Sequence, residues 1–314
     1  MSASPGRTLP SSGSIAACLA AVYLIWGTTY FAIKVAIGEL PPFLLAATRF
    51  LVAGSLLLGW QVLRGRPMPT AREWRGAATL GFFLLVVGNG SVVVAEHWIS
   101  SGATVALGSI VPLATALWAG VFGQWPRRME WGAIALGAAG TLVMLLGRDL
   151  QASLFGSVII LTGTVSWAFA TVLSRRIVVP RGATGFGAEM LAGGGMALAV
   201  SAALGERWTM PHSAPVWCAW GYLVAFGSLI GFSAFRYLAE RVSATLASSY
   251  AYVNPPVALI VGAWLGHERF SANVLVGLPI VLAAVGLLAW AHRQSASAPP
   301  RAPAANYDIA RGVE

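Results

Sequence analysis

The chain has 314 residues, of which 57% are hydrophobic and only 10% are charged, with a net charge of +9 and a mean hydropathy of +0.73. About a quarter of the residues in an ordinary soluble domain are charged, so this composition excludes a soluble globular protein and predicts a polytopic membrane protein. The basic residues are scattered between apolar runs and form no patch, so the positive charge predicts no nucleic-acid partner.

Apolar stretches of about 20 residues, the length needed to cross a bilayer as a helix, recur along the chain. Ten are predicted, at residues 14–37, 42–63, 74–95, 101–124, 130–147, 154–174, 185–204, 215–236, 243–266 and 272–292. The first run is longer than the core of a signal peptide, so we expect it to remain as a span. The predicted organisation is a tail at 1–13, five helices within 14–147, five within 154–292, and a disordered tail at 293–314 that is rich in Ala, Pro and Ser.

Arginine residues are distributed unequally between the two sets of connecting segments. Fifteen fall on one side: Arg7, Arg64, Arg66, Arg72, Arg75, Arg127, Arg128, Arg175, Arg176, Arg181, Arg236, Arg241, Arg293, Arg301 and Arg311. Only Arg148, Arg207 and Arg269 fall on the other. Since Lys and Arg are enriched in cytoplasmic loops, both termini are predicted to be cytoplasmic.

The two halves of the chain match each other at an offset of about 140 residues. The aligned pairs include Trp26 with Trp167, Arg49 with Glu189, Leu51 with Leu191, Gly54 with Gly194, Asn89 with Ser233, and Glu96 with Glu240. Because five is an odd number of helices, the second half must cross the membrane in the opposite sense to the first. The predicted fold is therefore all-α, with ten transmembrane helices arranged as two inverted five-helix repeats.

The predicted ninth helix, residues 243–266, carries polar residues and a proline pair in its middle. Pro255 and Pro256 have no backbone N–H to donate to the carbonyls of Ala251 and Tyr252. Unpaired backbone groups are not tolerated against lipid. The sequence therefore predicts a proline-broken helix that faces a water-filled cavity, as in the substrate sites of many transporters.

Polar and aromatic residues near mid-span occur on five of the predicted helices. They are Trp26, Tyr30, Asn89, Trp167, Thr171, Ser233, Tyr250 and Asn254. A tryptophan at mid-membrane lies away from the usual interfacial belt. Packing explains any one of these residues alone, but together they predict a substrate-binding cavity. Such a lining suits a neutral or zwitterionic solute with an apolar portion.

Charged residues within or at the ends of the predicted helices are candidates for gating or proton coupling, because charge is costly in hydrocarbon. They are Lys34, Arg49, Glu96 and Glu240. The alternative for Lys34 is an ammonium group that reaches the outer interface. Arg49 is expected either against a buried polar partner or at the outer mouth of the cavity. Glu96 and Glu240 close the third and eighth helices, where simple contact with water is the alternative.

Sequence motifs for nucleotide binding, hydrolysis or metal binding do not occur in their required context. We therefore predict no enzymatic activity, no cofactor and no bound metal. A transporter without a nucleotide site must use a proton gradient or the gradient of its substrate. The alternative function is a passive pore or facilitator for small neutral solutes.

Several short strings resemble those of the EamA-type transporters of the drug/metabolite transporter superfamily, most closely the bacterial YedA group. The strings include Trp26-Gly27-Thr28-Thr29-Tyr30-Phe31, Arg49-Phe50, Gly88-Asn89-Gly90, Ala95-Glu96-His97, Ser166-Trp167-Ala168-Phe169 and Ser248-Ser249-Tyr250-Ala251-Tyr252-Val253-Asn254-Pro255. This resemblance covers roughly residues 15–292. It implies ten helices in two inverted repeats, a location in the bacterial inner membrane, and a central cavity. It also implies efflux of small metabolites, amino acids or drugs, without identifying a substrate.

Overall fold

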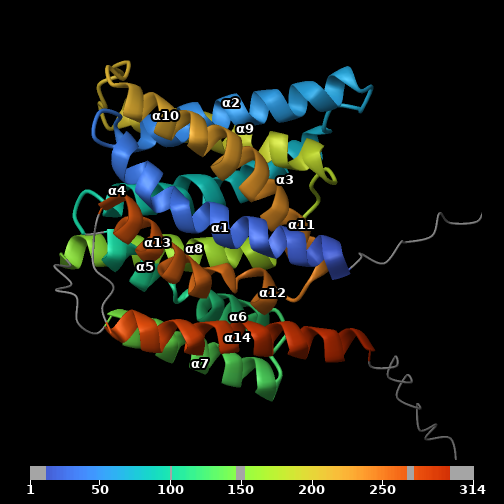
Figure 1. Ribbon diagram of the computed structural model, residues 1–314. Coiled ribbons are helices and arrows are strands. Elements are labelled where there is room, and N and C mark those ends of the chain that lie inside the picture. Colours follow the sequence, from blue (N-terminus) through green and yellow to red (C-terminus); the bar gives the residue numbers. More distant parts are fainter. Residues whose placement is uncertain (1–11, 100, 146–152, 267–271, 298–314) are drawn as a thin grey trace, which may run out of the picture.

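The computed structural model describes residues 12–99, 101–145, 153–266 and 272–297, and the regular elements in this part of the chain are all helical (Figure 1). The first half contains α1 (Ser12–Ala36), α2 (Pro42–Leu63), α3 (Ala71–Gly81), η1 (Phe82–Asn89), α4 (Gly90–Ala95), α5 (Ser101–Gly108), α6 (Val111–Val121) and α7 (Arg128–Leu145). The second half contains α8 (Leu154–Leu173), α9 (Ala183–Ala203), α10 (Ala214–Tyr222), η2 (Leu223–Phe232), α11 (Ser233–Arg241), α12 (Ala244–Ala247), α13 (Tyr250–Gly266) and α14 (Ala272–Ser297).

Six helices in the described part of the chain are long and apolar enough to cross a membrane. They are Ser12–Ala36, Pro42–Leu63, Ala71–Ala95, Leu154–Leu173, Ala183–Ala203 and Ala214–Arg241. Two of these, Ala71–Ala95 and Ala214–Arg241, are continuous helices whose middle segments, η1 and η2, are π-helical. The prediction of an all-α polytopic membrane protein is confirmed.

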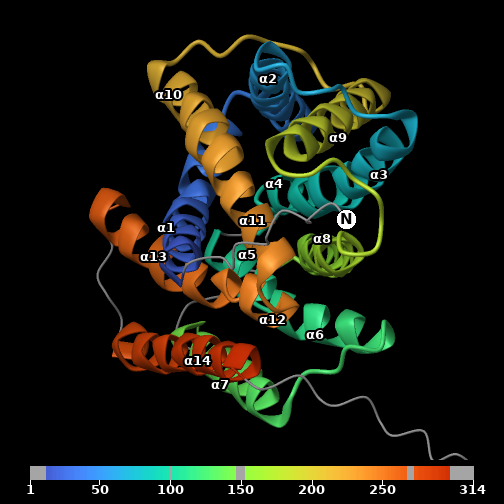
Figure 2. The ribbon, with the colours of Figure 1, turned by 90° about the vertical axis from the view of Figure 1, so that its right-hand side faces the viewer.

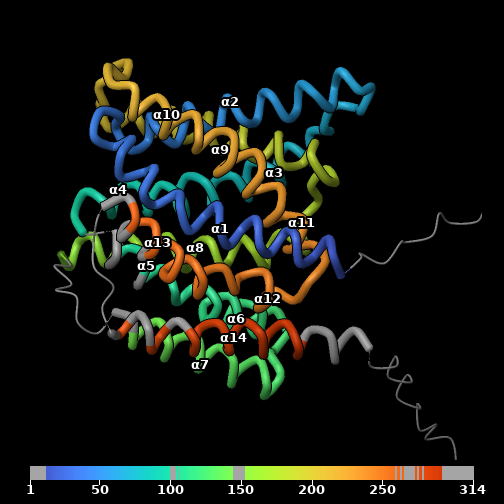
Figure 3. Tube along the Cα trace, in the orientation of Figure 1, coloured from blue at the N-terminus to red at the C-terminus, as the bar shows by residue number. Residues whose placement is uncertain are grey.

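Two helix pairs form opposite edges of the molecule. In the view along the helices, α2 lies beside α9 at one edge and α7 lies beside α14 at the other (Figure 2). The trace of the chain shows α7 and α14 running side by side although they are far apart in sequence (Figure 3). Helices α1 and α8 lie between these edges, and the space around them is where the candidate site forms.

Glycine allows α2 and α9 to approach each other closely. A Cβ atom at Gly54 would lie only 2.9 Å from the backbone nitrogen of Leu191, and one at Gly194 would lie 2.9 Å from the backbone nitrogen of Leu51. Small residues serve this purpose in membranes, where helices associate through close packing of their backbones. The two contacts are reciprocal: Gly54 meets Leu191, and Gly194 meets Leu51.

Two of the predicted helices are interrupted. Residues 101–124 form α5 and α6, which are separated at Ser109 and Ile110, just before Pro112. Residues 243–266 form α12 and α13, which are separated at Ser248 and Ser249. The prediction that Pro255 and Pro256 themselves break this helix is wrong, because both lie inside α13.

The interruption before α13 precedes the prolines by more than one turn. The N–H groups of Ala251 and Tyr252 donate to the carbonyls of Ser248 and Ser249, each at 3.1 Å, so the chain makes tight three-residue turns here. The Ser249 hydroxyl donates to the Leu246 carbonyl at 2.7 Å and lies 2.7 Å from the Tyr23 hydroxyl. A serine hydroxyl therefore provides a hydrogen bond to a backbone carbonyl at the interruption. The two prolines lie within the helix that begins after it.

The ends of the predicted segments shift by a few residues. The helix predicted at 215–236 extends to Arg241, and the one predicted at 74–95 begins at Ala71. Helix α14 continues to Ser297, into the segment predicted as a disordered tail from 293. Most of the tails predicted at 1–13 and 293–314 lies outside the described residues.

Candidate functional site

A cavity lies at the centre of the helices, and the non-atom space in it, open solvent included, is about 730 Å³. Its walls include six of the eight residues predicted to bind substrate: Trp26, Tyr30, Asn89, Trp167, Tyr250 and Asn254. These come from α1, η1, α8 and α13, so segments from both halves of the chain meet around one space.

Trp26 lies at the centre of the aromatic wall. Its ring contacts those of Trp167 and Tyr250 edge to face, with centroid distances of 5.4 and 4.9 Å. It also contacts Phe232 and Phe235, at 5.1 and 5.2 Å. The indole N–H of Trp26 donates to a backbone carbonyl of η2, that of Gly227, at 3.2 Å. These ring contacts, together with the hydrogen bond, hold the indole in one orientation.

Each of the two tryptophans packs against a glycine in a π-helical segment from the other half of the chain. A Cβ atom at Gly231 of η2 would lie 2.4 Å from Nε1 of Trp26. A Cβ atom at Gly88 of η1 would lie 3.0 Å from Cε3 of Trp167. Glycine at these two positions therefore leaves the room that the indole rings occupy. Short π-helical segments occur frequently at functional sites.

Two asparagine side chains supply unpaired polar atoms in the cavity. The Oδ1 atoms of Asn89 and Asn254 are buried and have no hydrogen-bond partner among the described residues. The Asn254 side chain also interacts with the Tyr30 hydroxyl. Because an amide can donate and accept, these groups can bind a polar part of a solute, while the indole rings contact an apolar part.

Thr171 and Ser233, which were also predicted to bind substrate, do not line the cavity. Thr171 is buried one turn beyond Trp167, and its hydroxyl donates to the Trp167 carbonyl at 2.9 Å. Its own carbonyl accepts from Ser174 at 2.8 Å. Ser233 is half-buried at the start of α11.

The four charged candidates lie in four different environments. Arg49 of α2 is only 2% exposed and lines the cavity. Glu96 is only 1% exposed, and neither of its carboxylate oxygens has a hydrogen-bond partner among the described residues. Lys34 is exposed and donates to the backbone carbonyl of Glu96 at 3.2 Å. Glu240 is exposed and forms ion pairs with two arginines. The alternative of simple contact with water therefore holds for Glu240, which is exposed, but not for Glu96, which is buried.

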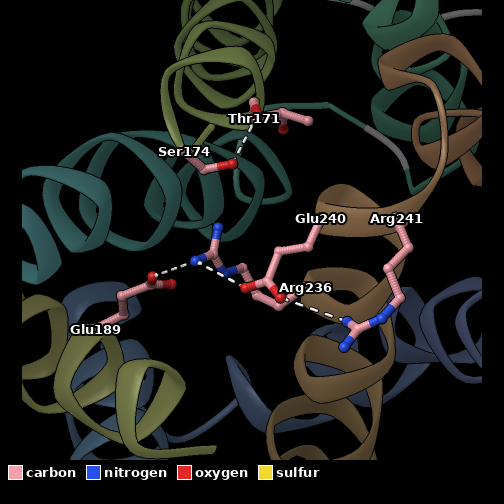
Figure 4. A network of polar contacts seen from close by, with 6 residues as sticks. All are labelled: Thr171, Ser174, Glu189, Arg236, Glu240 and Arg241. Atoms are coloured by element: carbon pink, nitrogen blue, oxygen red, sulfur yellow. Dashed lines mark hydrogen bonds and ion pairs between the residues drawn. The ribbon is translucent and has the colours of Figure 1, made fainter. Parts of the chain in front are cut away.

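A buried ion pair that the sequence patterns did not predict joins α9 and α11. Arg236, counted above among the arginines of cytoplasmic loops, lies inside α11 and is only 1% exposed. Its Nη2 atom lies 3.2 Å from Oε1 of Glu189 and 3.6 Å from Oε1 of Glu240, so the guanidinium sits between two carboxylates (Figure 4). Arg241 pairs with Glu240 at 3.4 Å. The signal in the sequence was Glu189, an acidic residue within an apolar span that requires a buried partner.

Comparison with known proteins identifies the family. The EamA-like transporter family matches the chain twice, over residues 11–146 and 154–290. YedA of Escherichia coli, described as an uncharacterized inner membrane transporter, is 42% identical over 271 residues, which cover 86% of this chain and 89% of YedA. An uncharacterized transporter of Synechocystis sp. is 29% identical over 303 residues, which cover 86% of this chain and 88% of the relative.

A protein of known crystal structure shares the fold. It is 19% identical to this chain and superposes with a TM-score of 0.74, over 90% of this chain and 100% of its own. The family itself is shown by the two matches to the family model, one on each half of the sequence, and by the identity to YedA: the chain belongs to the EamA-like transporter family.

Proposed function

We propose that the protein is a secondary transporter that exports small organic solutes, such as metabolites, amino acids or drugs, across the bacterial inner membrane by alternating access. The observation that carries this proposal is the central cavity, in which Asn89 and Asn254 present unpaired amide oxygens beside two indole rings. Unpaired polar atoms are costly in the interior of a membrane protein, and a polar solute would remove that cost. Family membership supports a transporter rather than an enzyme.

Packing between the two halves supports an arrangement as inverted repeats. If residues about 140 apart are related by a twofold axis, each contact must have a reciprocal partner. Gly54 with Leu191 and Gly194 with Leu51 are such a pair of contacts. A residue on the axis must contact its own equivalent, as Trp26 contacts Trp167. We therefore propose ten membrane-spanning helices, with the cavity on the axis that relates the two repeats.

Counterflow in proteoliposomes tests the proposed function. Compounds for this assay come from a growth screen, in which overexpression should protect cells against some members of a panel of toxic amino-acid analogues and drugs. Vesicles loaded with an unlabelled protective compound should then accumulate its labelled form against a gradient, and the rate should saturate. A passive pore would show linear uptake and no counterflow. Absence of saturable transport for every protective compound would contradict a transporter.

The arginine distribution predicts both termini in the cytoplasm. The asymmetry persists after Arg236 is removed from the count, since fourteen arginines still oppose three. Reporter fusions at Gly65 and Gly182 are expected to report a cytoplasmic location, and fusions at Glu39, Asp149 and His212 a periplasmic one, with Asp149 outside the described residues. A periplasmic signal at Gly65 would reverse the proposed orientation.

We propose that Glu96, rather than Glu240, couples transport to protons. Glu96 is buried without a hydrogen-bond partner in the described chain, whereas Glu240 is already neutralised by Arg236 and Arg241. Glu96→Gln should abolish the dependence of transport on an imposed pH gradient, and Glu240→Gln should retain it. The measurement is uptake into proteoliposomes with and without the gradient. A wild-type protein that is indifferent to collapse of the gradient would remove the coupling role from both residues.

A further inference from the structure

Arg49 is the one charged residue among the described residues that line the central cavity. It lies about two turns into α2, and only 2% of its surface is exposed. Its Nε and Nη1 atoms are buried and have no hydrogen-bond partner. In the described part of the chain, the ion pairs with buried arginine belong to Arg236, and none involves Arg49.

The contact between Arg49 and the Phe50 ring leaves hydrogen-bond donors of the guanidinium without a partner. The central carbon of the guanidinium lies over the Phe50 ring, 4.4 Å from the centroid. A cation–π contact uses the face of the guanidinium, however, and the N–H donors point outward within its plane. Arginine remains protonated in proteins, so the free donors belong to a full positive charge. Such a group binds carboxylates through two parallel hydrogen bonds.

Glu96 does not serve as the partner of Arg49. Glu96 is buried, but its carboxylate forms no ion pair in the described chain, and the cation that interacts with it is Lys34. By contrast, the equivalent position in the second half, Glu189, is neutralised by Arg236. At this pair of equivalent positions, one half of the protein therefore carries an acid in an ion pair, and the other carries an unpaired cation that lines the central cavity.

We propose, on the basis of the transporter function above, that Arg49 binds the carboxylate of the transported solute and that the solute is an organic acid or zwitterion with an apolar body. Phe50 contacts Phe232 at 5.5 Å, and Phe232 contacts Trp26 at 5.1 Å. The cation is thus separated from the indole wall by two adjoining rings. A carboxylate on Arg49 and an apolar group on Trp26 therefore fit within one small molecule.

Paired probes of equal shape test this assignment. The probes are 3-phenylpropionate and its neutral amide, 3-phenylpropionamide, and the measurement is the shift of the melting temperature of purified protein over a concentration series, which reports the dissociation constant. The wild type should bind the carboxylate about tenfold or more tightly than the amide, the usual advantage of a charge-assisted hydrogen bond. Arg49→Gln should abolish this preference, because the carboxylate loses much more affinity than the amide. Arg49→Lys should keep a smaller preference, because an ammonium cannot form the paired hydrogen bonds.

The melting temperature without ligand separates binding from a structural role. Loss of an unpaired buried charge should leave the Arg49→Gln protein as stable as the wild type or more stable, whereas loss of a structural arginine should lower its stability. Equal binding of the two probes, binding of neither, or a preference that survives Arg49→Gln would overturn the proposal. In proteoliposomes, transport of neutral solutes alone would overturn it while leaving the transporter function intact.

Discussion

Gly194→Leu is expected to destabilise the protein severely, while Gly195→Leu, one residue further along α9, is expected to have almost no effect. A Cβ atom at Gly194 would lie 2.9 Å from the backbone nitrogen and 3.0 Å from Cγ of Leu51, and backbone cannot move aside without separating α2 from α9. A Cβ atom at Gly195 would meet nothing within 4 Å. Overpacking at Gly194 should lower the free energy of unfolding by about 3 kcal/mol. The melting temperature in detergent should then fall by about 10 °C.

The reciprocal contact supplies a second matched pair. Gly54→Leu should cost about as much as Gly194→Leu, because Gly54 makes the equivalent approach to Leu191. Gly59→Leu, on the same helix α2, is the control, since a Cβ atom there is also unobstructed. Equal stability of the Gly194 and Gly195 variants would show that α2 and α9 do not depend on close packing. If Gly194→Leu lowered the melting temperature strongly and Gly54→Leu did not, the packing of the two repeats would not be related by a twofold axis.

The convergence of six predicted residues on one cavity could be anticipated because helical periodicity places residues on a face. Trp26 and Tyr30 lie one turn apart on α1, and Tyr250 and Asn254 lie one turn apart on α13. A helical stripe runs along the whole helix, however, whereas the cavity occupies only part of its length. Thr171 follows Trp167 by one turn on α8 but lies beyond the cavity, and its hydroxyl satisfies its own backbone instead.

The extent of the helices could not be read from hydropathy. An apolar run marks where the chain enters hydrocarbon, but a helix can continue into polar sequence when tertiary contacts stabilise it. The helix that ends at Arg241 does so, and Arg236 on it pairs with Glu189 from another helix. The π-helical segments η1 and η2 also change which residues face inward, and a period of 3.6 residues does not describe them.

The position of the interruption before α13 also could not be predicted from local sequence patterns. Proline was expected to interrupt the helix because it removes a donor. The interruption instead occurs at Ser248 and Ser249, where the Ser249 hydroxyl bonds to a backbone carbonyl and to Tyr23, a residue more than 200 positions away in sequence. Only the folded chain brings Tyr23 to that position. Local rules identified the segment, and the tertiary contact determined where it breaks.

Gly108→Leu is expected to reduce transport to the level of empty liposomes while the protein remains folded. Gly108 ends α5 and lines the central cavity, and a Cβ atom there would meet only the Tyr30 hydroxyl, at 3.8 Å. A larger side chain therefore enters the space that a solute needs without displacing backbone. The melting temperature should fall much less than in Gly194→Leu, because a Cβ atom at Gly108 meets no backbone.

A size series makes this prediction quantitative. Counterflow should decline in the order Gly108→Ala, Gly108→Leu, Gly108→Phe, because each side chain fills more of the cavity that Trp26 and Trp167 enclose. Gly132→Leu on α7 is the control, since a Cβ atom there meets nothing within 4 Å and the residue does not line the cavity. Folded Gly108→Phe protein that transports at the wild-type rate would mean that the solute does not pass through this cavity. Loss of transport that follows loss of stability, rather than side-chain size, would point to a disturbed fold instead of a blocked path.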